Sequence, residues 1–256
     1  MPNDATSDGL PGATPATALL LHFFGGTSRT WTEARAALDA RGVRTIAPDL
    51  RGFGDAMDAA GPFTVDAYAD DIVALAAREA GARWTLVGHS MGGKIAFAVA
   101  ARRPLGLASL VLVAPSPPWP EPMSDADRAR LRAAYGDRAP AAVTIDGIVA
   151  HPLTGAVRER TLDDELRASA DAWHAWLDAG SREDLAARAP NVAVPVTVLA
   201  GEKDRGITPA VAGAVAAALG GSAVTVPDAG HLLPLEATNA VVAAIAAATG
   251  SRQDVR

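Results

Sequence analysis

A serine between two glycines is the residue of this sequence best suited to nucleophilic chemistry. The pentapeptide Gly88-His89-Ser90-Met91-Gly92 follows an apolar, β-rich run and precedes a helical pattern. A sharp strand-to-helix turn lifts a serine hydroxyl above a sheet, and flanking glycines prevent clashes at such a turn. The N-terminus of the helix favours negative charge that develops at the serine. We therefore expect Ser90 to be the nucleophile of a covalent mechanism.

A serine hydroxyl needs a base to take its proton, and the base needs an acid that orients it. His231 lies in a loop after the last β-rich run, and the functional residues of α/β proteins are usually found in loops at the carboxyl ends of parallel strands. Asp204 follows the preceding β-rich run. We expect His231 to be the general base and Asp204 the orienting acid. Other nearby side chains fit these roles less well: Glu202 and Asp228 for the acid, and His22, His89, His151 and His174 for the base.

The oxyanion of a tetrahedral intermediate requires preorganised N–H donors. The residue after the nucleophile, Met91, is expected to supply one backbone N–H and to line the pocket with its side chain. The loop His22-Phe23-Phe24-Gly25-Gly26, which follows the first β-rich run, is expected to supply the second donor from Phe24.

These residues must be positioned by a sheet, and the sequence alternates β-rich apolar runs with helical patterns. Near-continuous apolar runs are typical of parallel strands that helices cover on both faces. The alternation predicts an α/β fold with a mostly parallel sheet of about six strands. The expected strands are Ala18–Phe24, Val43–Pro48, Arg83–Gly88, Leu107–Ala114, Val194–Ala200 and Ser222–Pro227. The expected helices are Thr32–Ala40, Val65–Ala80, Met91–Arg103, Thr208–Leu219 and Ala237–Ala248.

One interval, residues 115–193, breaks the alternation with helical composition and no strand pattern. It opens with the proline-rich Pro115–Met123 and closes with Ala187–Pro195, two clusters of helix and strand breakers. We expect a helical cap over 115–193, inserted into a core formed by residues 18–114 and 194–250. Residues 1–17 and 251–256 are expected to be disordered tails, because their polar, Pro- and Gly-rich composition buries little apolar surface.

Bulk properties exclude several function classes. The formal net charge is −6 and no basic block stands out, so binding to nucleic acid or to an anionic membrane is not expected. The absence of cysteine rules out disulfides, thiolate metal sites and a cysteine nucleophile. Neither a signal peptide nor an apolar run of membrane-spanning length is visible, and a cytoplasmic location is expected.

The motifs together resemble the α/β-hydrolase superfamily. They are Leu19–Trp31, Ala47–Gly54, Leu86–Lys94, Leu199–Asp204 and Ala229–Glu236, in the order typical of that family. The resemblance implies a serine hydrolase with a Ser90, Asp204, His231 triad and no metal or organic cofactor. A second family position for the acid, after the fourth strand, reads Ala114-Pro115-Ser116 and offers no carboxylate, which favours Asp204.

The sequence departs from the family pattern at two places. Many members have glycine directly after the first-motif histidine, where this chain has Phe23, so either Phe23 or Phe24 could present the oxyanion N–H. Many members also begin with a β-hairpin, whereas the residues before Ala18 have no strand pattern. We therefore expect a sheet without that hairpin.

The expected reaction is hydrolysis of a small, partly apolar carboxylic ester through an acyl-serine. A carbon–carbon bond hydrolase, a lactonase or an aminopeptidase could use the same triad, and a non-enzymatic ligand receptor could keep the fold. The expected partner is a small-molecule substrate; the oligomeric state is left open. Candidate substrate-binding residues are Phe23, Trp119, Trp173 and Trp176, although Trp173 and Trp176 could equally pack the cap on the core. Asp49, Arg51 and Asp55 are expected to be structural, and Lys94 is expected on a helix surface.

Overall fold

A computed structural model describes residues 16–250, which form a six-stranded sheet flanked by helices. The strand order is β2-β1-β3-β4-β5-β6, and all neighbouring strands pair in parallel. This confirms the predicted α/β fold and its six parallel strands. The strands are β1 Thr17–Leu21, β2 Arg44–Ile46, β3 Trp84–His89, β4 Leu107–Val113, β5 Val196–Gly201 and β6 Ser222–Val226. The tails and the segment in which a preceding hairpin would lie fall largely outside the described residues.

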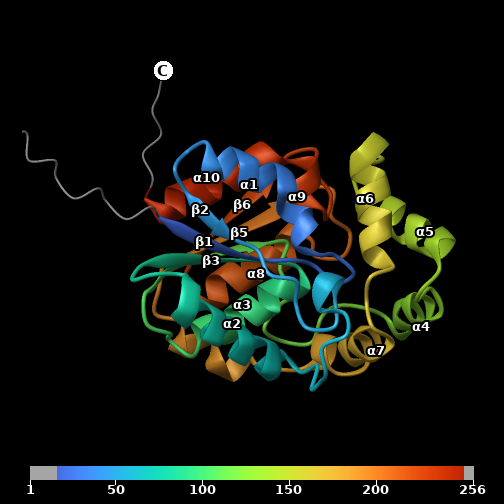
Figure 1. The fold of residues 1–256 in the computed structure, drawn as a ribbon, viewed down its shortest axis with the longest axis horizontal. Helices are drawn as coiled ribbons and strands as arrows, with labels where there is room; N and C mark the ends of the chain where they lie inside the picture. The colour runs from blue at the N-terminus through green and yellow to red at the C-terminus, as the bar shows by residue number, and fades with distance from the viewer. Residues whose placement is uncertain (1–15, 251–256) are drawn as a thin grey trace, which may run out of the picture.

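Helices cover both faces of the sheet (Figure 1). One face carries α1 (Thr32–Asp39) and α10 (Thr238–Thr249), and the other carries α2 (Val65–Glu79), α3 (Met91–Ala100) and α8 (Pro209–Ala218). The central strands β1 and β3 are buried along their whole length, because both of their faces lie against helices. This explains why their sequences are apolar without alternation.

The interval between β4 and β5 holds four α-helices, which lie together at one side of the sheet (Figure 1). They are α4 Asp125–Ala133, α5 Arg138–Ile148, α6 Gly155–Glu165 and α7 Ala170–Asp178. At two of their N-termini a serine side chain accepts a backbone hydrogen bond, Ser124 at α4 and Ser169 at α7. The expected helical cap is therefore present, and a short helix, α9 (Leu233–Glu236), follows β6.

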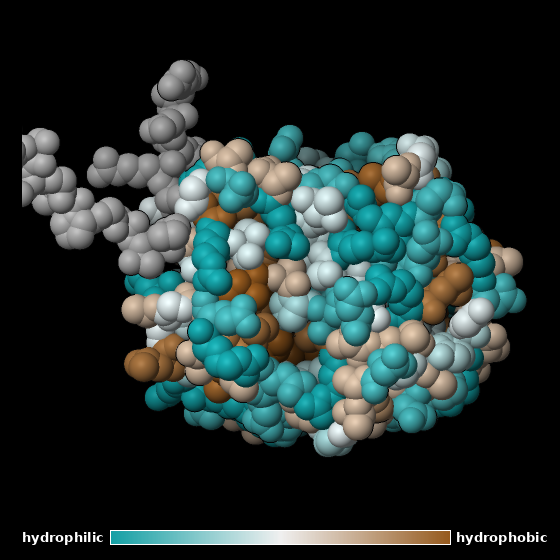
Figure 2. Space-filling view, viewed as in Figure 1, coloured by the Kyte–Doolittle hydropathy of each residue, from teal (hydrophilic) through white to brown (hydrophobic). Residues whose placement is uncertain are grey.

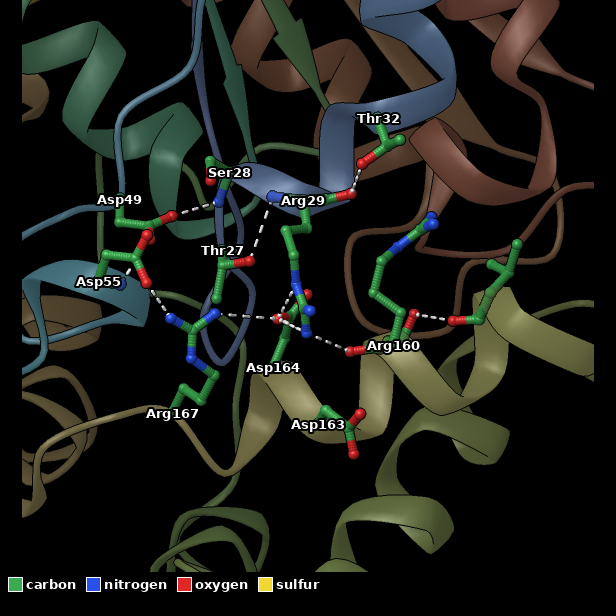
Figure 3. A network of polar contacts seen from close by, with 12 residues as sticks. Thr27, Ser28, Arg29, Thr32, Asp49, Asp55, Arg160, Asp163, Asp164 and Arg167 are labelled. Atoms are coloured by element: carbon green, nitrogen blue, oxygen red, sulfur yellow. Dashed lines mark hydrogen bonds and ion pairs between the residues drawn. The ribbon is translucent and has the colours of Figure 1, made fainter.

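Polar contacts join the core loops to each other and to the cap (Figure 3). Asp49 accepts the backbone N–H groups of Ser28 and Asp55, each at 2.6 Å. Arg51 forms an ion pair with Asp71 at 2.6 Å, and Asp55 pairs with Arg167 of the cap. The structural roles expected for Asp49, Arg51 and Asp55 agree with these contacts.

The surface seen in Figure 2 is mostly hydrophilic, with hydrophobic residues confined to small areas between polar ones. Among the helices of residues 16–250, none combines the length and hydrophobicity needed to cross a membrane.

Candidate active site

Ser90 occupies a strained turn between β3 and α3. Its φ of 52° and ψ of −116° lie in a region that non-glycine residues rarely adopt, so neighbouring contacts must hold the turn. Its N–H donates to the Val113 carbonyl at 3.0 Å, and its carbonyl accepts the N–H groups of Gly93 at 2.7 Å and Ser116 at 3.0 Å. These bonds anchor the turn to the end of β4, and the N-terminus of α3 points at the serine.

Two glycines allow the close backbone approach that this turn requires. A Cβ atom at Gly88 would lie 2.3 Å from the Gly92 carbonyl oxygen, and one at Gly92 would lie 2.6 Å from the His22 carbonyl oxygen. Both separations are far below van der Waals contact. The first turn of α3 can therefore lie directly against the ends of β1 and β3 only because both side chains are absent.

Ser90, His231 and Asp204 come together at the carboxyl ends of β3, β6 and β5. His231 Nε2 lies 2.9 Å from Ser90 Oγ, and His231 Nδ1 lies 2.6 Å from Asp204 Oδ2. The other Asp204 oxygen accepts the N–H groups of Gly206 and Ile207 at 2.9 and 3.0 Å. The carboxylate is thereby oriented, and Nδ1–H can donate to it while Nε2 accepts the serine proton.

The surroundings make His231 a stronger base. Burial lowers its pKa, but the Asp204 carboxylate, assisted by Glu121 and Glu236, opposes this effect and holds the pKa above the usual histidine value. Its backbone is also fixed, because His231 N–H donates to the Ile148 carbonyl at 2.8 Å. Its own carbonyl lies 2.9 Å from His89 Nε2. His89 is fully buried, with a pKa well below the usual value because of burial, as expected for a packed turn residue.

The alternative residues are engaged elsewhere. Asp228 pairs with His151 at 2.9 Å and with Lys203, and Glu202 accepts the Asp228 N–H at 3.0 Å. His174 lies against the Tyr135 ring on the cap, with a centroid separation of 5.8 Å. None of these side chains reaches Ser90.

His22 holds the loop that is expected to provide the second oxyanion donor. Its Nδ1 lies 2.8 Å from the Phe23 carbonyl oxygen, and its Nε2 accepts the Leu50 N–H at 3.0 Å. Burial lowers its pKa to about 4, so the ring stays neutral and can donate on one side while it accepts on the other. Phe24 follows Phe23 in this loop. Met91 is the first residue of α3, so its backbone N–H has no hydrogen-bond partner within the helix and can donate to a ligand.

A cavity of about 310 Å³ opens over Ser90 and His231. Four aromatic side chains line it: Phe23, Phe24, Trp173 and Trp176. Trp173 and Trp176 are each only 3% exposed and also belong to the main hydrophobic core. Phe24 packs on Trp173 with ring centroids 4.2 Å apart. Both interpretations of the tryptophan pair therefore hold, since the same side chains join the cap to the core and form a wall of the cavity.

Comparison with known proteins places the chain in a family. Residues 18–245 match the model of the alpha/beta hydrolase family. The chain belongs to this family. A thermophilic esterase from Thermogutta terrifontis has 31% identity to this hydrolase and a TM-score of 0.76, covering 91% of this chain and 88% of that one. The enol-lactonase from Burkholderia xenovorans has 25% identity and a TM-score of 0.77, covering 93% and 92%.

Curated relatives match over shorter segments. Lipase LipV of Mycobacterium tuberculosis is 37% identical over 102 residues, which is 40% of this hydrolase and 38% of LipV. An uncharacterised Mycobacterium bovis protein is 38% identical over 104 residues, and the chain spans only 30% of its length. These matches support a hydrolase with the α/β fold and leave its substrate to be argued from the site.

Two side chains expected near the substrate lie elsewhere in the hydrolase. Met91 is fully buried in the core and is not among the residues that line the cavity. Trp119 also does not line the cavity; it packs against the main core from the start of the cap. Both positions follow from α3, which is buried on every side, and from the proline-rich segment that passes over it.

The expectation that Lys94 lies on a helix surface is wrong. Lys94 is fully buried, and its Nζ donates to the carbonyl oxygens of Trp119 at 3.2 Å and Glu183 at 2.5 Å. Burial lowers its pKa to about 8. Because Trp119 begins the cap and Glu183 lies near its end, one ammonium group ties both ends of the cap to the helix that follows Ser90.

Three acidic residues of the cavity were not identified from the sequence. Glu121, Asp127 and Glu165, all from the cap, line it together with Ser90. Burial raises the pKa of Glu121 and of Glu165, to about 8 for Glu165. None of the three belongs to a motif, and the sequence carries no signal that distinguishes them from the many surface acids of the cap.

Proposed function

We propose that this hydrolase cleaves a small, partly apolar carboxylic ester through an acyl-serine intermediate. The observation that supports this most strongly is the continuous hydrogen-bonded line from Ser90 through His231 to Asp204, at 2.9 and 2.6 Å, beneath an aromatic-lined cavity. A cavity of about 310 Å³ suits a small ester rather than a polymer.

The proposed steps follow from these positions. Ser90 Oγ attacks the ester carbonyl carbon while His231 Nε2 takes the hydroxyl proton. The carbonyl oxygen becomes an oxyanion and accepts the N–H groups of Met91 and Phe24. His231 then gives its proton to the leaving alkoxide, and the acyl group stays on Ser90. Water, deprotonated by His231, attacks the acyl-serine; the bond between the acyl carbon and Ser90 Oγ then breaks, His231 returns the proton to Oγ, and the acid leaves.

Lactone hydrolysis is a second candidate, because the Burkholderia enol-lactonase covers most of this chain. A lactone is a cyclic ester, so the same groups would act on it without change. A carbon–carbon bond hydrolase and a non-enzymatic receptor remain alternatives for the same fold, and the test below separates them.

The decisive test is hydrolysis of p-nitrophenyl esters of increasing acyl length by wild type, Ser90→Ala and Ser109→Ala, with fluorophosphonate labelling of each. Ser109 is a buried serine of β4 that bonds to Thr85 at 2.7 Å, with no base beside it, and serves as the matched control. Wild type and Ser109→Ala should turn over and label, whereas Ser90→Ala should do neither.

Other outcomes would reject the proposal. Turnover by Ser90→Ala near the wild-type rate would exclude the serine mechanism. Labelling of Ser90 without ester turnover would favour carbon–carbon bond hydrolysis. A single slow turnover with tight retention of the ligand would favour the receptor.

A further inference from the structure

The side chain of Glu165 reaches the cavity without a partner. Glu165 is the last residue of α6, is 5% exposed and lines the same cavity as Ser90 and His231. Within residues 16–250, its carboxyl group makes no hydrogen bond and no ion pair. A mostly buried carboxyl group that faces a cavity, with no protein group bound to it, is suited to ligand recognition.

Nearby arginines do not neutralise Glu165, because they are bound to its neighbour. Asp164 accepts from Arg29 Nε at 2.8 Å, and Arg167 lies 3.9 Å from the same carboxylate (Figure 3). Burial, together with the negative charge of Asp164, raises the pKa of Glu165 to about 8. The two adjacent acids at the end of α6 therefore differ: Asp164 is paired with Arg29 of the core, whereas Glu165 faces the cavity.

Glu165 also lies against the loop of residues 22–26, called the oxyanion loop below because it contains Phe24. Gly25, which follows Phe24, has a φ of +82°, and a Cβ atom on it would lie 2.8 Å from both Cδ and Oε1 of Glu165. The carboxyl group therefore touches the backbone beside the proposed oxyanion donor. A substrate whose carbonyl oxygen is held by the Phe24 N–H would therefore have its scissile carbonyl close to the Glu165 carboxyl group.

The other charged residues that line the cavity are compensated by opposite charges or exposed to solvent. Asp204 bonds to His231, and Asp127 pairs with Arg130 at 3.3 Å. Glu121 is under the positive charges of Lys94 and Arg128. Arg205 is exposed to solvent. Among the described residues that line the cavity, Glu165 is the acid for which no cation compensates.

We propose that Glu165 is a specificity residue that binds a hydrogen-bond donor, an amino or hydroxyl group, on the acyl part of the substrate near its scissile carbonyl. This inference rests on the proposed ester hydrolysis. A site that leaves a buried polar group unpaired discriminates strongly against substrates without the matching group. The rings of Phe24 and Trp173, which line the same cavity, would bind the acyl carbons and would also stabilise an ammonium group.

The test compares substrates that differ only in the donor. Methyl butyrate is measured beside its α-hydroxy, β-hydroxy, α-amino and β-amino analogues, by proton release at neutral pH. Wild type, Glu165→Gln, Glu165→Leu and Glu159→Leu are compared. Glu159 is the matched control, since it is an exposed acid of the same helix that pairs with Arg138 at 2.5 Å. Each enzyme is judged by the ratio of kcat/KM for an analogue to that for methyl butyrate, so a general loss of activity cancels.

We expect wild type and Glu159→Leu to favour at least one analogue by about tenfold or more, and Glu165→Leu to bring that ratio close to one. Glu165→Gln separates the two sources of the donor, because an amide still accepts from a hydroxyl group but, unlike the carboxyl group, cannot lose a proton to balance the charge of an ammonium group. A wild type without preference for any analogue, or a preference that survives Glu165→Leu, would overturn the inference. Failure of wild type to hydrolyse any ester would instead overturn the proposed function, and this inference with it.

Discussion

Gly92→Ala should damage this enzyme, although alanine is the better helix former. Gly92 lies in the first turn of α3, and an added Cβ would lie 2.6 Å from the His22 carbonyl oxygen and 2.7 Å from that of Leu21. Ordinary contact begins near 3.4 Å. The helix must therefore retreat from β1 by about 0.8 Å, and both partners are backbone atoms that cannot rotate away. Overpacking of this kind costs about 1–3 kcal/mol of stability.

The same retreat should displace Ser90 and the Met91 N–H from the oxyanion loop. A misplacement of about 1 Å can lower the rate by about 10²-fold. The assay is urea unfolding together with kcat/KM on a p-nitrophenyl ester and the rate of fluorophosphonate labelling.

Gly213→Ala is the matched control. Gly213 lies within α8 and nothing comes within 4 Å of its added Cβ, so this variant should gain about 0.5–1 kcal/mol and keep its activity. Equal stability and activity of Gly92→Ala and Gly213→Ala would contradict this prediction, because the close approach at Gly92 would then not position Ser90.

Three further predictions concern charge. Asp204→Asn should lower kcat by about 10⁴, since the amide neither fixes the His231 tautomer nor stabilises its cation, and a loss below tenfold would contradict this role. The acid limb of kcat/KM against pH should have its midpoint above about 6.5, because the pKa of His231 is raised, and should move to lower pH in Asp204→Asn; a midpoint at or below 6.5 would argue against it. Glu165, with its pKa raised from 4.5 to about 8, holds a proton in the folded state that the unfolded state releases, so the free energy of unfolding should fall as pH rises through this window. Urea unfolding at pH 5 and 8 should show that the free energy of unfolding of the wild type falls by on the order of a few kcal/mol more than that of Glu165→Gln. An equal change in both proteins would contradict the raised pKa of Glu165.

Local patterns predicted the fold because each depends on neighbours in the sequence. A buried parallel strand must be apolar throughout, and the turn at Ser90 needs a glycine two residues before and two residues after the serine, so both patterns are visible in short stretches of sequence. The ends of the core elements shifted by only a few residues; α3, for example, ends at Ala100 rather than Arg103. The positions of Ser90, Asp204 and His231 follow from the same rule, since each stands in the turn or loop that follows a recognisable strand.

Contacts between distant segments were not predictable in this way. Lys94 was expected in solvent because a lysine in an otherwise apolar helix usually marks its exposed face. Its carbonyl partners, Trp119 and Glu183, lie at opposite ends of the cap and 25 and 89 residues away in the chain. Glu165 is similar, because its place in the cavity depends on how α6 docks on the oxyanion loop, and helical periodicity does not determine that docking.

The reactivity of the buried Lys94 amino group also provides a measure of cap movement. The sequence contains two lysines, Lys94 and Lys203, and Lys203 is exposed. An amine-acylating reagent can reach Lys94 only while the carbonyls of Trp119 and Glu183 are detached from it, whereas Lys203 lies at the surface and reacts without movement of the cap. The ratio of the two acylation rates therefore reports how often both ends of the cap detach from α3, and the measurement needs no introduced label.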